Sequence, residues 1–224
     1  DEKNFPGRLF VEHFRRAREA GLHTIAHAGE AAGAESVRQA VEDLGAERIG
    51  HGIRATEDES VLDLLAERGI ALEVCPTSNV QTSTVASFET HPLGFFLARG
   101  LCATLSTDDP SISGIDLAHE YRIAHERLGL SELQLRTLQE NAVAAAFLSD
   151  AERAKLLARA LAIRRVGGTV RVGVAPGVLR RSELEARVRE RRRARPGRHR
   201  VSLQHQAEER DRVDRRDLER RAAG

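Results

Sequence analysis

Four short apolar runs recur along the chain, and each leads into a cluster of polar residues. The clusters are His27-Ala28-Gly29-Glu30, Gly50-His51-Gly52, Cys75-Pro76-Thr77-Ser78-Asn79 and Ser106-Thr107-Asp108-Asp109-Pro110. The steps from His27 to His51, Cys75 and Asp108 are 24, 24 and 33 residues, about the length of one strand-helix unit. This period restricts the chain to folds in which short strands and helices alternate.

The segments between the apolar runs carry the spacing of amphipathic helices. The predicted helices cover residues 36–44, 60–69, 91–100, 117–128 and 131–147. A glycine stands at the end of each of the first three, and Ser131 suits the start of the last. Strands that alternate with helices predict a parallel sheet with helices outside it. In such sheets the functional residues collect at the carboxyl ends of the strands, where all four polar clusters are expected.

The four clusters, in this order and at these intervals, resemble the carboxyl half of the adenosine deaminase family. Residues 1 to about 157 carry the resemblance. It implies an α/β fold that is the C-terminal part, about strands five to eight, of a TIM-type (β/α)8 barrel. It also implies a Zn²⁺ cofactor, a small-molecule purine nucleoside substrate, and hydrolytic deamination of adenosine or 2'-deoxyadenosine to inosine and ammonia.

The resemblance assigns a role to five residues. His27 and Asp108 would be zinc ligands, and their nitrogen and oxygen donors suit Zn²⁺. Glu30 would protonate the purine N1, and His51 would orient the attacking water or accept its proton. Asp109 would form a hydrogen bond with the purine N7. Two adjacent carboxylates repel each other without a cation nearby, so the Asp108-Asp109 pair itself favours a metal site.

The residues leave several alternatives open. Asp109 before Pro110 is also a good helix N-cap, and His51 between two glycines suits a turn. The segment Cys75–Asn79 is interpreted as a rigid loop that shapes the pocket, with no catalytic part for Cys75. The substrate could be another 6-aminopurine compound: adenine, aminodeoxyfutalosine or AMP. The remaining histidines of the first 163 residues are interpreted as structural or surface residues: His13, His23, His91, His119 and His125.

One departure from the family pattern is large. The family takes two zinc ligands from a His-x-His pair on its first strand, and no His-x-His occurs in these 224 residues. Strands one to four have no counterpart, so the sequence predicts a fragment. A tetrahedral zinc site normally needs three protein ligands, and half a barrel leaves open strand edges. We therefore expect the chain by itself to have little or no deaminase activity.

The charge of the chain divides at about residue 163. Residues 1–163 hold 16 Arg and Lys against 25 Asp and Glu, whereas residues 164–224 hold 19 Arg against 9 acids. We therefore predict two regions, a partial barrel domain over 1–163 and an Arg-rich tail over 164–224. Three interpretations of the tail remain: a disordered polar extension, a nucleic-acid-binding arm, or the product of a shifted reading frame. If the tail is a nucleic-acid-binding arm, the chain would be a non-enzymatic remnant with a basic, nucleic-acid-binding tail.

Two further features bear on compartment. The sequence holds no secretory signal and no 18-residue apolar span, which predicts a soluble, cytoplasmic protein without a membrane partner. Its two cysteines, Cys75 and Cys102, lie in or beside predicted strands and are expected to be reduced core thiols.

Overall fold

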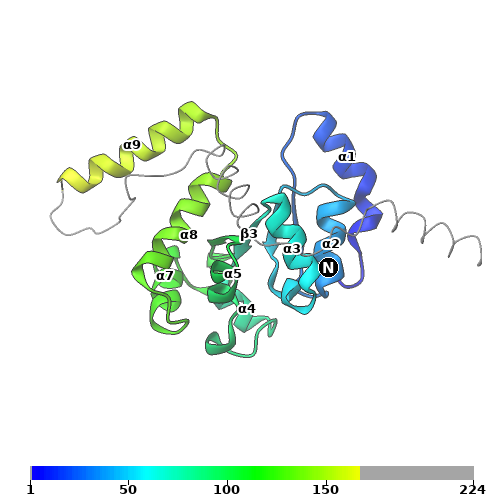
Figure 1. The fold of residues 1–224 in the computed structure, drawn as a ribbon, viewed down its shortest axis with the longest axis horizontal. Helices are drawn as coiled ribbons and strands as arrows, with labels where there is room; N and C mark the ends of the chain where they lie inside the picture. Colours follow the sequence, from blue (N-terminus) through cyan, green and yellow to red (C-terminus); the bar gives the residue numbers. More distant parts are fainter. Residues whose placement is uncertain (1, 167–224) are drawn as a thin grey trace, which may run out of the picture. The chain divides into compact units, whose positions relative to one another are not determined.

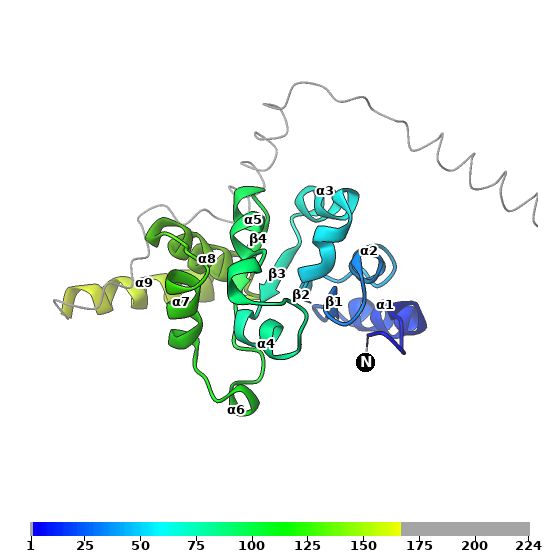
Figure 2. The same cartoon turned by 90° about the horizontal axis from the view of Figure 1, so that it is seen from below.

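The computed structural model describes residues 2–166. Within them, four strands form one parallel sheet in the order β1-β2-β3-β4, so that each strand pairs with the next along the chain (Figure 2). The strands are β1 (Ile25–Ala28), β2 (Arg48–His51), β3 (Ala71–Val74) and β4 (Cys102–Leu105). Consecutive parallel strands joined by helices confirm the predicted α/β class.

Helices connect the strands (Figure 1). The α-helices are α1 (Val11–Glu19), α2 (Ala34–Glu42), α3 (Glu59–Arg68), α4 (Pro76–Gln81), α5 (Leu93–Ala98), α6 (Pro110–Ser113), α7 (Leu117–Glu126), α8 (Glu132–Ala145) and α9 (Asp150–Val166). Short 3-10 helices are η1 (Gly7–Phe10), η2 (Ile53–Glu57) and η3 (Phe88–Thr90). The five helices predicted from periodicity correspond to α2, α3, α5, α7 and α8, which confirms them.

The hydrophobic core lies between the sheet and these helices. Strand register places Ile49, Leu72 and Ala103 in one row across the sheet, and all three are fully buried. Helix α2 packs on β1, and α5 and α8 both pack on β4. The opposite row of the register contains His27, Gly50 and other, more polar residues. Alternation along each strand therefore separates a core face from the face that carries the site.

Two local predictions need correction. The apolar run that leads into the first polar cluster predicts a strand that ends before His27, but β1 runs from Ile25 to Ala28, so His27 lies within the strand. The segment Cys75–Asn79 is not a loop, because Pro76 begins helix α4. Proline suits the first helical position, but the helix has only six residues and its capping partner lies on α7. No local periodicity reports such a short element.

The sheet has open edges at β1 and β4 within the described residues. Beside β1 lies a groove of about 490 Å³, whose lining includes Phe5, Phe10 and Phe14 together with Ile25 and His27. Phe5 is 58% exposed and Ile25 38%, which is high for such apolar side chains. In a closed barrel each edge strand pairs with another strand, so this apolar surface lies where a preceding strand-helix unit would pack.

Three other predictions meet the structure to different extents. Cys75 and Cys102 are free thiols, and burial raises the pKa of Cys75 to about 12 and that of Cys102 to about 11, as expected for core cysteines. No helix within residues 2–166 is long and apolar enough to cross a membrane. The predicted division at residue 163 falls inside α9, and the tail from residue 167 onward lies outside the described residues.

Candidate active site

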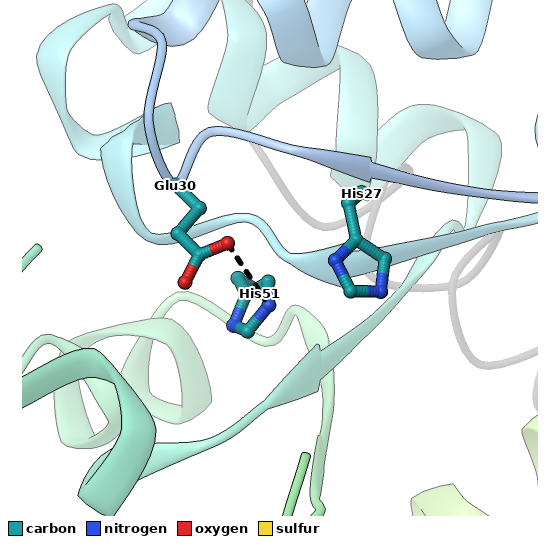
Figure 3. Close-up of side chains that lie close together, drawn as sticks. All are labelled: His27, Glu30 and His51. Atoms are coloured by element: carbon teal, nitrogen blue, oxygen red, sulfur yellow. Dashed lines mark ion pairs between the residues drawn. The ribbon is translucent and has the colours of Figure 1, made fainter. Parts of the chain in front are cut away.

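Side chains of three residues meet at the carboxyl edge of β1 and β2 (Figure 3). One nitrogen or oxygen atom from each of His27, Glu30 and His51 lies within 4.8 Å of the other two. Nε2 of His51 is 3.3 Å from Oε2 of Glu30, and the rings of His27 and His51 lie edge to face with centroids 4.9 Å apart. The structure thus brings together one predicted zinc ligand and both predicted catalytic residues.

Asp108 reaches the same centre from the segment after β4. Its Oδ2 lies 3.9 Å from Nε2 of His51 and accepts a hydrogen bond of 2.7 Å from the hydroxyl of Ser78 on α4. The four side chains offer imidazole nitrogens and carboxylate oxygens, the donors that Zn²⁺ takes together with thiolate. The described residues therefore fit a divalent metal of this type.

His51 is 1% exposed and stands at the centre of this cluster. Burial lowers the pKa of its imidazole, and the neighbouring His27 lowers it further, whereas the carboxylates of Glu30, Asp108 and Glu2 act in the opposite direction. The net direction is downward, so the buried ring favours its neutral form.

The backbone is strained at two of the predicted site residues. His51 has φ 64° and Asp108 has φ 59°, a left-handed conformation that residues other than glycine rarely adopt. Such a conformation costs on the order of 1–3 kcal/mol and persists only where the surrounding structure imposes it. His51 is the last residue of β2 and Asp108 lies three residues after the end of β4, and their side chains approach to 3.9 Å.

Glu30 is held in place by a residue that the sequence did not single out. The carboxylate of Glu2 accepts hydrogen bonds from the backbone N–H groups of Gly29, Glu30 and Ala31 at 2.6, 3.1 and 2.7 Å, and another from the hydroxyl of Ser36. Burial raises the pKa of Glu2, but these hydrogen bonds outweigh burial and lower it overall. Glu2 therefore fixes the loop that carries Glu30.

Asp109 occupies the helix-start position that its sequence context suggested. Its Oδ1 accepts hydrogen bonds from the backbone N–H groups of Ser111 and Ile112, at 2.9 and 3.0 Å, and so caps α6. The predicted contact of Asp109 with the purine N7 is not tested by this geometry and stays a prediction.

Gly50 leaves the space that the His27 ring occupies. The two residues are partners in the register of β1 and β2, and a Cβ added at Gly50 would lie 2.6 Å from Cδ2 of His27. Contacts this short do not occur, so a side chain here must push the imidazole aside.

We expect Gly50→Ala to destabilise the chain by about 1–3 kcal/mol, the usual cost of overpacking. The measurement is urea unfolding of the full chain, with the NMR signals of the His27 ring as the local readout. Gly94→Ala is the matched control, because the added Cβ would meet Leu130 at an ordinary 3.4 Å. Equal stability changes in the two variants, with unmoved His27 signals, would contradict the argument.

Sequence reasoning missed the residues that support the site from behind. Asn79 is buried and forms a hydrogen bond with His51, and His91, a buried structural histidine, forms a hydrogen bond with Asn79. The sequence holds little that would mark these two residues as parts of the site. Asn79 lies in the segment that the sequence predicts to be a loop, and His91 stands before a proline.

Parallel strands that pair in the order of the chain, with helices between them and a histidine-carboxylate cluster at their carboxyl ends, have the arrangement of α/β-barrel proteins. The adenosine deaminase family matches residues 1–162. The chain therefore belongs to the adenosine deaminase family, as the four motifs predicted.

Individual relatives agree with this assignment. The chain is 56% identical to an adenosine deaminase from Erwinia tasmaniensis over 159 residues, which cover 71% of this chain and 48% of the relative. Among solved structures it is similar to an adenine deaminase from Arthrobacter aurescens, with a TM-score of 0.67 and 37% identity, over 71% of this chain and 49% of that one. It is also similar to an amidohydrolase from Burkholderia ambifaria with bound Zn, with a TM-score of 0.65 and 29% identity, over 70% and 44%.

These matches cover only part of each relative. The chain spans about half the length of the curated relatives that it matches. The four strands within residues 2–166 correspond to part of a (β/α)8 barrel, which confirms the predicted fold class.

Proposed function

We propose that this chain forms the carboxyl half of a zinc-dependent deaminase that converts adenosine to inosine, or 2'-deoxyadenosine to 2'-deoxyinosine, with release of ammonia. The observation that carries the proposal is the convergence of Glu30, His51 and Asp108 beside His27 at the carboxyl edge of the sheet. Identity of 56% to an adenosine deaminase supports the reaction class.

The reaction consumes one water. A C–O bond forms at the purine C6, the bond from C6 to the amino nitrogen breaks, and ammonia leaves. Glu30 supplies a proton to the ring N1, which makes C6 more electrophilic. His51, 3.3 Å from the Glu30 carboxylate, orients the attacking water or accepts its proton.

His27 and Asp108 would hold the metal, and the amino half of the barrel would supply the remaining ligands. A zinc ion in such a site supplies Lewis acidity and lowers the pKa of water to about 7, which provides a nucleophile at neutral pH. The nearby Glu30 carboxylate and the His51 ring, both within 4.8 Å of a His27 nitrogen, complete a polar centre for the purine amino group.

Adenine is the second candidate substrate, because an adenine deaminase shares this fold at 37% identity. Aminodeoxyfutalosine and AMP remain further alternatives from the sequence. The higher identity to an adenosine deaminase, 56% against 37%, supports adenosine over adenine. A nucleic-acid-binding role would depend on the Arg-rich tail, which from residue 167 onward lies outside the described residues.

A completed barrel tests the proposal. The completed barrel is a fusion in which the amino half of the Erwinia tasmaniensis adenosine deaminase is joined to residue 2 of the chain. Zn²⁺ is added, and the release of ammonia is measured with adenosine, adenine or AMP as the substrate. We expect turnover of adenosine by the completed barrel and none above background by the chain alone, since two ligands hold zinc poorly. Turnover by the chain alone at the rate of a full-length relative would overturn the need for the missing half. A folded, zinc-loaded barrel with no turnover would overturn the function.

A further inference from the structure

A chain of hydrogen bonds leads from the amino end of α5 to the centre of the site. The backbone N–H of Leu93 donates to Nδ1 of His91 at 3.2 Å, and Nε2 of His91 lies 3.3 Å from Oδ1 of Asn79. Nδ2 of Asn79 lies 3.0 Å from Nδ1 of His51, whose Nε2 faces Glu30. Asn79 is 0% exposed and His91 8%, so water does not compete for these groups.

The first bond fixes the direction of all the others. A backbone N–H can only donate, so Nδ1 of His91 must be the accepting, unprotonated nitrogen. Neutral His91 then carries its proton on Nε2 and donates it to an oxygen, which places Oδ1 of Asn79 on that side. The amide nitrogen of Asn79 therefore faces His51 and donates to its Nδ1. The proton of neutral His51 is left on Nε2.

We propose that Asn79 and His91 are positioning residues that hold neutral His51 in the tautomer with its proton on Nε2, the nitrogen that faces Glu30 and Asp108. His51 thereby presents a hydrogen-bond donor, in a fixed ring orientation, to the centre of the site. Of the two roles considered for His51, this tautomer selects orientation of the attacking water and excludes acceptance of its proton at Nε2. The value of this tautomer for catalysis rests on the proposed deaminase function, whereas the tautomer itself follows from the hydrogen bonds alone.

The surroundings of His91 agree with a neutral ring. Burial alone lowers the pKa of His91 to about 4. A second proton on Nδ1 would point at the N–H of Leu93 and leave that helix-end donor without an acceptor. At neutral pH His91 therefore donates a hydrogen bond through Nε2 to Oδ1 of Asn79, which fixes the orientation of the Asn79 amide.

The test is NMR of the full chain labelled with ¹⁵N, in which long-range ¹H–¹⁵N correlations show which ring nitrogen of each histidine carries a proton. We expect His51 to be protonated on Nε2 and unprotonated on Nδ1, with loss of these signals in His51→Gln as the assignment. His125 is an internal reference with the opposite tautomer. Its Nδ1 lies 2.8 Å from the carbonyl oxygen of Leu130, which can only accept, so Nδ1 of His125 carries the proton. Protonation of His51 on Nδ1 in the unaltered chain would overturn the proposal.

Asn79→Asp tests the direction of the hydrogen bonds that lead from Leu93 through His91 and Asn79 to His51, which we call the relay. A carboxylate can only accept, so we expect the protonated and unprotonated nitrogen signals of His51 to exchange places, while those of His125 stay. An unchanged His51 pattern in a folded variant would overturn the proposal. If the variant does not fold, the unaltered chain still decides through the coupling expected across the hydrogen bond from the Asn79 amide nitrogen to Nδ1 of His51, and its absence would also overturn the proposal.

These readouts require neither bound metal nor turnover. If the completed barrel proves inactive while His51 shows the expected tautomer, the proposed function fails and the relay stands. If the completed barrel is active while His51 carries its proton on Nδ1, the proposed function stands and the relay is disproved.

Discussion

Replacing Glu30 by Gln in the completed barrel is expected to lower kcat for adenosine by about 10²- to 10⁴-fold, the usual contribution of a general acid or base. Gln keeps the size of the side chain and can still accept the hydrogen bond of 3.4 Å from the Thr82 hydroxyl. It cannot deliver a proton to the purine N1. The measurement is steady-state ammonia release with zinc content determined on the same samples.

The matched control is Glu35→Gln on the exposed surface of α2. Its carboxylate makes only exposed contacts within its own helix, with Gln39 at 3.4 Å and Arg38 at 3.5 Å, and exposed pairs of this kind contribute little to stability. We expect it to retain the parental kcat. A Glu30→Gln variant with normal zinc content and less than a tenfold loss would exclude Glu30 as the proton donor.

His91 is expected to make the chain less stable as the pH falls from about 6.5 to 4. Burial lowers its pKa to about 4 in the folded chain, from an ordinary value of about 6.5. Between these values the unfolded chain binds a proton at His91 and the folded chain does not, so the stability present above pH 6.5 is lost on acidification. At 1.36 kcal/mol for each pKa unit, the loss is about 3 kcal/mol.

His91→Gln removes this titration while keeping a side chain that can both donate and accept. We expect urea unfolding midpoints of the variant to fall less than those of the unaltered chain over the same pH range, by an amount equivalent to about 3 kcal/mol. His13→Gln on α1, at an exposed position, controls for the loss of one histidine. Parallel pH profiles for His91→Gln and the unaltered chain would show that His91 is not buried in its neutral form.

The sequence predicted the parts of this structure that depend on local patterns. Apolar residues at helical spacing predicted α2 and α3, because a helix that covers a sheet must bury one stripe of its surface. The interval between polar clusters predicted a parallel sheet, and the carboxyl ends of parallel strands necessarily lie on one edge. The sequence alone therefore predicts that Glu30, His51 and Asp108 lie together, as they do in the structure.

The helix α4 shows where local patterns end. Its first turn is capped by the carboxylate of Glu120, 43 positions away on α7, which accepts from the backbone N–H of Thr77 at 3.2 Å. Burial raises the pKa of Glu120, and the hydrogen bonds from Thr77 only partly offset this. A six-residue helix stabilised by a distant side chain leaves no periodic signal in the sequence.

The sequence by itself determined the alternation of strands and helices, the edge at which the polar residues collect, and the family to which the chain belongs. Only the tertiary structure decided how those residues are held. The support of the Glu30 loop by Glu2 and the hydrogen bonds of Asn79 with His51 and His91 join residues 12 to 29 positions apart. Periodicity reports which face of an element is buried, whereas the choice of a hydrogen-bond partner is made only when separate elements pack together.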